Sequence, residues 1–520
     1  MINAVGRDIP DYLLKDGREV YQGKNYKDGQ YIKKASPIVR RGEKPVESKL
    51  CKTIREACEK CGAHDGMTFS FHTEFRDGDY VAAMVCKVLV EEMGLKDLHV
   101  AATSLGTAQD IFADYMEQGI IVEAQTSGVR GRIGEVISAG KLKNPAIIRS
   151  HGGRPRAVEA GEVHIDIAFL AAATADCCGN AKGQGGKNNC GSMGFANHDA
   201  HYADHTVIIT DTLVPFPNLP SSISCIDVDA VCVVDAIGDP QKIATKEARM
   251  TDNPRELMMA QNVANVIAAT PYFKDGFSFQ TGVGGPSLAV NRFLEEHMKE
   301  AGIKMSFALG GTSSAICALQ DKGYVDYILD TQDFDQGAAA HLFSNPHHIE
   351  IDLSEYANAG NKGAYVNKLD YVVLSALEID TKFNVNVITG SDGVLRGAPG
   401  GHPDTAAGSK CCIIVTPLTR GRMATVCKDV VTVTTPGDCV DVLVTDYGIA
   451  VNPARQDIIE CLDKAGIKHV TIEALQKKAY SLVGEPDPLE WEDRVVAIVE
   501  ARDGTILDVV RQVKPYTFED

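Results

Sequence analysis

Residues 65–106 read DGMTFSFHTEFRDGDYVAAMVCKVLVEEMGLKDLHVAATSLG, and residues 275–314 read DGFSFQTGVGGPSLAVNRFLEEHMKEAGIKMSFALGGTSS. Each segment predicts an apolar strand, a polar or glycine-rich turn, an amphipathic helix, a second short apolar strand and a loop of small residues. Because two distant segments of one chain share the same order of elements, they indicate an internal duplication.

Later apolar segments keep the same relation, at offsets of about 204 to 212 residues. IDIAFL at 165–170 matches LDYVVL at 369–374, TVIIT at 206–210 matches CIIVT at 412–416, and VDAV at 228–231 matches VDVL at 440–443. One such match could arise by chance, whereas several in order at a near-constant spacing indicate two homologous domains.

The strands are apolar on both faces and separated by helical patterns, which is typical of parallel sheets covered by helices. The sequence therefore predicts an α/β protein with two homologous tandem open-sheet domains, joined near Gly238-Asp239-Pro240. We expect an irregular N-terminal arm at 1–45, a first domain at 46–240 and a second domain at 241–520.

Composition limits the classes of partner. The 520 residues include 52 basic and 70 acidic side chains, a net charge of −18, which disfavours nucleic acid and anionic membranes. The N-terminus MINAVGRDIPDYLL lacks the pattern of a signal peptide, and no apolar run approaches the ~18 residues of a membrane span. The fifteen cysteines are scattered, as in a reduced protein, so we expect a cytoplasmic location.

Ligands of parallel sheets bind at the loops beyond the carboxyl ends of the strands, so the glycine-rich loops are the candidate site. GAPGGHPD at 397–404 would bring backbone N–H groups close to a developing oxyanion. Its counterpart in the first half, CGSMG at 190–194, could be purely structural. TGVGGP at 281–286 is either a tight strand–helix turn or an anion cradle at a helix N-terminus.

Charged loops supply further candidates. RSHGGR at 149–154 and RGR at 130–132 offer guanidinium groups that bind carboxylates bidentately, unless they form ion pairs within the protein. LDTQDFDQG at 329–337 follows a strand and is otherwise a solvated turn. No metal site is expected, because His347, His348 and Glu350 lack helical ligand spacing. These residues alone predict acyl or phosphoryl chemistry.

One segment resembles a known family. VTTPGDCVDVLVTDYGIA at 433–450 is similar to a segment of acyl-CoA transferases, and the loop at 397–404 resembles their GxGGxxD oxyanion loop. More narrowly, the chain from about residue 45 onward resembles the citrate lyase alpha-subunit family. The stretches that carry this resemblance are DGFSFQTGVGG, RSHGGR, DTLVPFPN, SALEIDTKFNVNVITGSDGVLRG and VTDYGIAVNPARQD.

The resemblance implies domains of the CoA-transferase type and an enzyme that exchanges acetate for citrate on an acyl carrier protein thioester. The expected partners are the beta (lyase) and gamma (acyl carrier) subunits, with citrate and acetate as substrates. The chain itself would bind no cofactor directly, since the dephospho-CoA-derived prosthetic group belongs to the carrier and acetyl-CoA can mimic it. The alternatives are a CoA-transferase or acyl-CoA hydrolase for another small carboxylic acid, or a scaffold that docks the other subunits.

The family's nucleophilic glutamate, in a TEMFSDG-like segment, is replaced here by Gln332. An amide cannot form a glutamyl thioester, so we expect direct transfer through a mixed anhydride, although Asp333 could still act covalently. The expected catalytic groups are Gly397, Gly400, Gly401, Gln332 and Asp333. The expected citrate ligands are Arg130, Arg132, Arg149, His151 and Arg154, and the expected ligands of the thioester arm are Gly282, Gly284, Gly285 and Ser104.

Overall fold

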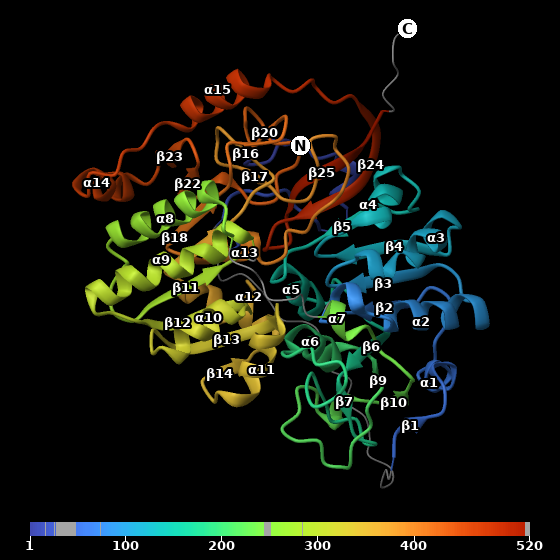
Figure 1. Ribbon diagram of the computed structural model, residues 1–520. Helices are drawn as coiled ribbons and strands as arrows, with labels where there is room; N and C mark the ends of the chain where they lie inside the picture. Colours follow the sequence, from blue (N-terminus) through green and yellow to red (C-terminus); the bar gives the residue numbers. More distant parts are fainter. Residues whose placement is uncertain are drawn as a thin grey trace.

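The computed structural model describes residues 1–15, 17–24, 26–27, 48–72, 74–243, 251–282 and 284–514. Two large sheets lie side by side, each with helices packed on its faces (Figure 1). Helices α5 (Gly153–Glu159), α6 (Gly194–Tyr202), α12 (Leu353–Ala357) and α13 (His402–Gly408) lie near the centre of the molecule, where the two halves meet. The α/β class predicted from the sequence is confirmed.

The first sheet has ten strands, parallel except for the last. In order across the sheet they are β1 (Leu50–Cys51), β10 (Ala230–Val233), β9 (His205–Thr210), β6 (Ile167–Ala172), β2 (Thr68–Phe71), β3 (Leu98–Ala102), β4 (Ile121–Thr126), β5 (Ala146–Ile148), β24 (Trp491–Glu500) and β25 (Ile506–Val513).

The second sheet has eight strands, and only its last pair is antiparallel. Its order is β14 (His348–Glu350), β13 (Val325–Asp333), β12 (Met305–Thr312), β11 (Phe277–Thr281), β15 (Tyr371–Leu374), β18 (Cys411–Val415), β22 (Val442–Thr445) and β23 (Gly448–Val451).

Each half also has its own set of helices. The first half holds α1 (Ile54–Lys60), α2 (Val81–Lys87), α3 (Ile111–Glu117), α4 (Gly131–Ser138), α5 and α6, followed by α7 (Pro240–Ile243). The second half holds α8 (Pro254–Ala269), α9 (Gly285–Ala301), α10 (Ser314–Asp321), α11 (Gln336–Ser344), α12, α13, α14 (Gln456–Lys464) and α15 (Ile472–Val483).

The duplication is confirmed by the strand order. Strands β10, β9, β6, β2, β3, β4 and β5 occupy the same successive positions as β22, β18, β15, β11, β12, β13 and β14. The offset between partners runs from 202 residues, Ala146 to His348, to 212 residues, Ala230 to Val442. Loops that follow equivalent strands are therefore equivalent positions in the two halves.

The domain limits differ from those expected. Strand β24 pairs in parallel with β5, Ala497 opposite Ala146, so residues 491–513 complete the first sheet and do not belong with the rest of 241–520. The short strand β5 would otherwise be an open sheet edge. The described part of the N-terminal arm packs on the same strands, since the Tyr21 N–H donates to the Ile506 carbonyl at 2.9 Å. Residues 28–47 lie outside the described residues.

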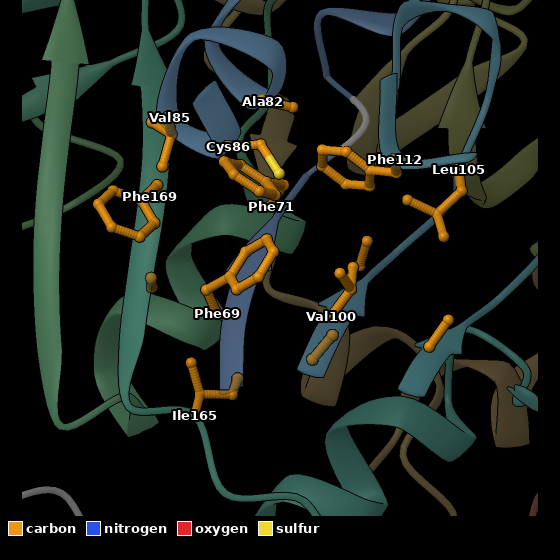
Figure 2. Close-up of a cluster of buried hydrophobic side chains, with 14 of the residues drawn as sticks. Phe69, Phe71, Ala82, Val85, Cys86, Val100, Leu105, Phe112, Ile165 and Phe169 are labelled. Carbon is orange, nitrogen blue, oxygen red and sulfur yellow. The ribbon is translucent and has the colours of Figure 1, made fainter. Parts of the chain in front are cut away.

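The core of the first half is built from aromatic side chains of adjacent strands. Phe69 and Phe71 of β2 pack edge to face at 5.4 Å, and Phe71 stacks on Phe169 of β6 at 5.9 Å (Figure 2). Phe112 of α3 closes the cluster at 6.2 Å from Phe69. These rings bury a large apolar area and fix the carboxyl end of the central strands. Within the described residues, none of the helices is both long and apolar enough to cross a membrane.

Candidate active site between the two halves

The loop at 397–401, between the short strand β17 (Val385–Asn386) and α13, lies against the strand ends of the first sheet. The Val129 N–H donates to the Gly397 carbonyl at 3.1 Å, and the His151 N–H donates to the Gly400 carbonyl at 2.8 Å. Both donors follow strands of the first sheet, β4 and β5. Carboxyl-end loops of the two halves therefore meet, and such loops are where parallel sheets bind their ligands.

Asp404 fastens this contact. Its buried carboxylate accepts hydrogen bonds from the Ser150 hydroxyl and the Gly152 N–H, both at 2.8 Å. Arg502 approaches it at 3.9 Å. Burial raises the pKa of Asp404 to about 6, because removal from water disfavours the charged form. Asp404 is the aspartate of the GxGGxxD-like loop, and its role here is to hold the two halves in register.

The three glycines of the expected oxyanion loop behave differently. The Gly397 N–H donates to the Ile388 carbonyl at 3.0 Å, and a Cβ at Gly397 would lie 2.0 Å from the Val387 oxygen. Gly397 is therefore a packing glycine, which corrects its assignment as an oxyanion donor. The N–H groups of Gly400 and Gly401 donate to no acceptor among the described residues.

The backbone at these two residues depends on glycine. Gly400 has φ of 53°, in the left-handed region, and a Cβ at Gly401 would lie 2.3 Å from the Tyr356 hydroxyl oxygen. The same hydroxyl accepts a hydrogen bond from the Gln280 amide at 2.9 Å. A ligand oxygen could thus approach two adjacent N–H groups that larger residues would displace.

Gln332 and Asp333 end strand β13. The Gln332 side chain is buried, and the backbone N–H of Gln332 donates to the Asp330 carboxylate at 3.1 Å. Asp333 points to the first half, where it accepts a hydrogen bond from the Ser192 N–H at 3.0 Å. Burial, and then repulsion from Asp330, raise the pKa of Asp333 well above its ordinary value. A carboxyl group held in its neutral form is a poor nucleophile.

Of the expected citrate ligands, three arginines are engaged within the protein. Arg149 binds Glu500 of β24 bidentately at 2.6 and 3.1 Å, and Arg154 binds Asp199 of α6 at 2.6 Å. Exposed Arg132 pairs with Asp114 and Glu117 at 2.6 and 2.9 Å. Buried charges need such partners, so Arg149 and Arg154 are structural residues and not ligands.

Arg130 is the exception in that group. Its backbone N–H donates to the Leu105 carbonyl at 2.9 Å, while its exposed side chain forms no ion pair with a described residue. His151, also expected to bind citrate, is not a cation. Burial, and then Arg154, lower its pKa to about 4. The neutral ring packs edge to face on Phe195 at 4.8 Å, and its Cε1 would lie 3.5 Å from a Cβ at Gly400.

Arg76 is a candidate that the sequence motifs missed. Its guanidinium lies 4.8 Å above the ring of Phe334, and its Nε is buried without a hydrogen-bond partner among the described residues. Burial, and then repulsion from Arg130, lower its pKa to about 10. Two guanidinium groups that repel each other beside one loop cluster form a natural site for a carboxylate.

Its position could have been noticed through the duplication. Arg76 follows β2, and the glycine loop at 282–285 follows β11, the equivalent strand. Arg76 also has φ of 47°, which is unusual for a residue with a side chain and typical of functional loops.

The expected ligands of the thioester arm fall into two places. The Gly282 N–H donates to the Val373 carbonyl at 2.9 Å, and Gly284 and Gly285 begin α9. Two buried side chains of α9 that have no hydrogen-bond partner among the described residues, Ser287 and Asn291, lie in its first two turns. Ser104 lies apart from them, on the β3 loop next to Leu105, and so belongs to the arginine side of the site.

Comparison with known proteins agrees with this arrangement. The family model described as "Citrate lyase, alpha subunit (CitF)" matches residues 47–513. The citrate lyase alpha chain of Klebsiella pneumoniae is 49% identical over 503 residues, 97% of each chain. That of Escherichia coli K12 is 52% identical over 472 residues, 91% of this chain and 92% of the relative.

Two solved structures place the fold. The alpha subunit of citrate lyase from Streptococcus mutans, in complex with citrate, matches with a TM-score of 0.95 and 49% identity, over 99% of this chain and all of that one. The malonate decarboxylase alpha subunit from Acinetobacter baumannii matches with a TM-score of 0.62 and 16% identity, over 84% of this chain and 87% of that one. At that identity the second likeness concerns the fold alone.

Proposed function

The chain belongs to the citrate lyase alpha-subunit family, and we propose that it exchanges acetate for citrate on an acyl-carrier thioester by direct transfer through a mixed anhydride. As a member of that family it is the citrate transferase component of the citrate lyase complex. Citrate is its substrate, and other subunits of the complex are its partners. The direct route rests on one observation, the amide of Gln332 at the position where related transferases carry a nucleophilic glutamate.

The chemistry has two steps. A citrate carboxylate oxygen attacks the acetyl thioester carbonyl, the C–S bond breaks, and the thiolate leaves behind a citrate–acetate mixed anhydride. The thiolate then attacks the citryl carbonyl, and acetate departs with the bridging oxygen. Binding both acyl partners together removes the entropic cost of a bimolecular reaction.

The residues at the site can serve each step. The N–H groups of Gly400 and Gly401, which donate to no acceptor in the described part of the chain, would stabilise the oxyanion of both tetrahedral intermediates. Arg76 and Arg130 would bind the citrate carboxylates that do not react. Gln332 would position the acyl group, because a buried amide binds an acyl oxygen without competing as a nucleophile.

The carrier and its cofactor complete the proposal. The thioester would be borne by a dephospho-CoA-derived arm of the gamma subunit, and the beta subunit would cleave the citryl carrier. The alpha chain would hold only the arm, at Gly284, Gly285 and the first turn of α9, where backbone N–H groups suit a phosphate.

Kinetics and chemical trapping test the direct route. We expect initial rates with acetyl-CoA and citrate to require both substrates bound together, and borohydride added after acetyl-CoA alone to leave activity intact. Gln332→Glu should lower activity, because it adds a buried carboxylate beside anionic citrate, and Gln332→Ala should be milder. Ping-pong kinetics with borohydride label on Asp333 or Asp335 would show a covalent enzyme intermediate instead.

The choice of acid is tested in the same assay. We expect citryl-CoA to form from acetyl-CoA and citrate. Transfer to other small carboxylic acids without any citryl-CoA would favour a CoA-transferase of different specificity, and hydrolysis alone would favour an acyl-CoA hydrolase. An isolated chain without activity on any thioester donor would favour the scaffold.

A further inference from the structure

Three buried side chains at the carboxyl edge of the second sheet bring ligand atoms together. Asp330 and Asp333 end β13, and His348 begins the neighbouring strand β14. One ligand atom from each lies within 4.8 Å of the other two. The three side chains are 0%, 2% and 4% exposed, respectively, so the cluster is not a solvated acidic surface.

One polar atom of each of these side chains is hydrogen-bonded to another residue of the protein. Asp330 accepts the Gln332 N–H at 3.1 Å, and Asp333 accepts the Ser192 N–H at 3.0 Å. The Nδ1 atom of His348 lies 2.9 Å from Nδ1 of His341, in a hydrogen bond. Such outer contacts are what fix the orientation of metal ligands.

The opposite atom of each side chain is left without a partner. Asp330 Oδ2, Asp333 Oδ1 and His348 Nε2 are buried and, with both aspartates charged, have no hydrogen-bond partner among the described residues. Protonation of one aspartate would let the two carboxyl groups bond to each other. The His348 Nε2 and Asp330 Oδ2 atoms are 3.5 Å apart, too far for a good hydrogen bond. Buried polar atoms without partners are rare, and three that converge on one point call for a common explanation.

We propose that Asp330, Asp333 and His348 bind one divalent transition-metal ion, such as Zn²⁺ or Mn²⁺. Two carboxylate oxygens and an imidazole nitrogen are a donor set of these ions, whereas Mg²⁺ and Ca²⁺ prefer oxygen alone. The ion would stabilise both buried carboxylates in their charged form, and Asp333 would lose its proton on binding. A single proton shared by the aspartates would leave His348 Nε2 unpaired.

An ion at this position would hold together parts of both halves. Asp333 also holds Ser192 of the first half, and Gln332 lies between the two aspartates in sequence. Binding would therefore fix the end of β13, the loop at 190–194 and the orientation of Gln332. A nearby group, Cys317, His341 and His348, could also bind a metal, but its imidazoles already hydrogen-bond each other. The spacing of the three ligands along the chain gave no motif, because they meet only through strand pairing.

Metal content tests the proposal. The full chain, stripped with a chelator and dialysed against Zn²⁺ or Mn²⁺, should retain one ion and melt several degrees higher than the stripped chain. Asp330→Asn and His348→Gln should abolish retention of that ion. His164→Gln is the matched control, because it breaks an exposed group of His164, Asp166 and Asp204 and should retain the ion.

Three results would overturn the proposal. The first is a wild-type chain that retains no ion and melts at the same temperature with and without either metal. The second is a His348→Gln chain that still retains the ion. The third is a chain that loses the ion in Cys317→Ser but keeps it in Asp330→Asn. The melting of the wild-type chain needs no variant, so a variant that fails to fold still leaves a decisive measurement.

Discussion

The loops at 190–194 and 397–401 occupy equivalent places in the two halves, yet their backbone N–H groups differ in whether they are hydrogen-bonded within the protein. The first precedes α6 and β9, and the second precedes α13 and β18. Each lies on the other half. The first loop contacts the ends of β13 and β14, and the second contacts the loops after β4 and β5, which are the equivalent strands. The halves thus hold each other through a pseudo-symmetric pair of contacts.

The difference lies in the backbone N–H groups. In the first loop, Cys190 and Gly191 donate to the Gly183 carbonyl at 2.9 and 3.0 Å, Ser192 donates to Asp333, and Met193 donates to Glu350. In the second loop, Gly400 and Gly401 have no acceptor among the described residues. One copy of a duplicated contact has become structural, and the other keeps donors for a ligand.

The largest expected effect comes from the second loop. Gly401→Ala places a methyl group 2.3 Å from the Tyr356 hydroxyl oxygen, so either the backbone at 401 or the buried Tyr356 ring must move, and we expect the N–H to be displaced. Removing one oxyanion donor costs about 10²- to 10³-fold in kcat. We expect a loss of this size in transfer from acetyl-CoA to citrate, measured at saturating substrates.

Gly194→Ala is the matched change at the start of α6, where a Cβ would lie 2.2 Å from the Ile351 oxygen. The clash is similar, but we expect lower thermal stability and a kcat within a few-fold of wild type. If Gly194→Ala lost as much kcat as Gly401→Ala, the two loops would not differ in function.

The next prediction compares Arg130, which forms no ion pair with a described residue, with Arg132, which does. Arg130→Ala should raise the citrate KM about 10- to 100-fold and leave the KM for acetyl-CoA nearly unchanged, since a charged hydrogen bond contributes about 1.5–3 kcal/mol. Arg132→Ala is the control, because Arg132 already pairs with surface acids. Equal effects of the two substitutions on citrate KM would mean that Arg130 is not a ligand.

The duplicated fold and the glycine loop at 397–401 could be predicted because both depend on residues that are close together in the sequence. The arginines could not. Arg149 looked like a ligand because nothing near it in sequence showed Glu500, 351 residues away, which β24 brings beside β5. The partner of Arg154 is equally hidden in the sequence, since Asp199 lies on α6, 45 residues further along the chain. Arg76 belongs to no motif, and only its place after β2 relates it to the site.

The smallest effect tests the carboxylate that fastens the second loop. The pKa of Asp404 is about 6 in the folded chain, raised by burial above the ordinary value of 3.8. A raised pKa means that the folded state binds the proton more tightly than the unfolded state. The contribution of Asp404 to stability is therefore full below about pH 4 and is lost as the pH rises through about 6.

Unfolding by denaturant at pH 7 and pH 5 measures this contribution. Protonation of Asp404 should add about 1 kcal/mol to the free energy of unfolding between these pH values, as a two-unit change across a pKa near 6 implies. Other buried carboxyl groups titrate too, so the comparison is with Asp404→Asn, whose gain should be smaller than that of wild type by this amount. An equal gain in both proteins would mean that Asp404 keeps an ordinary pKa, and that the contact between the halves at 397–404 is solvated.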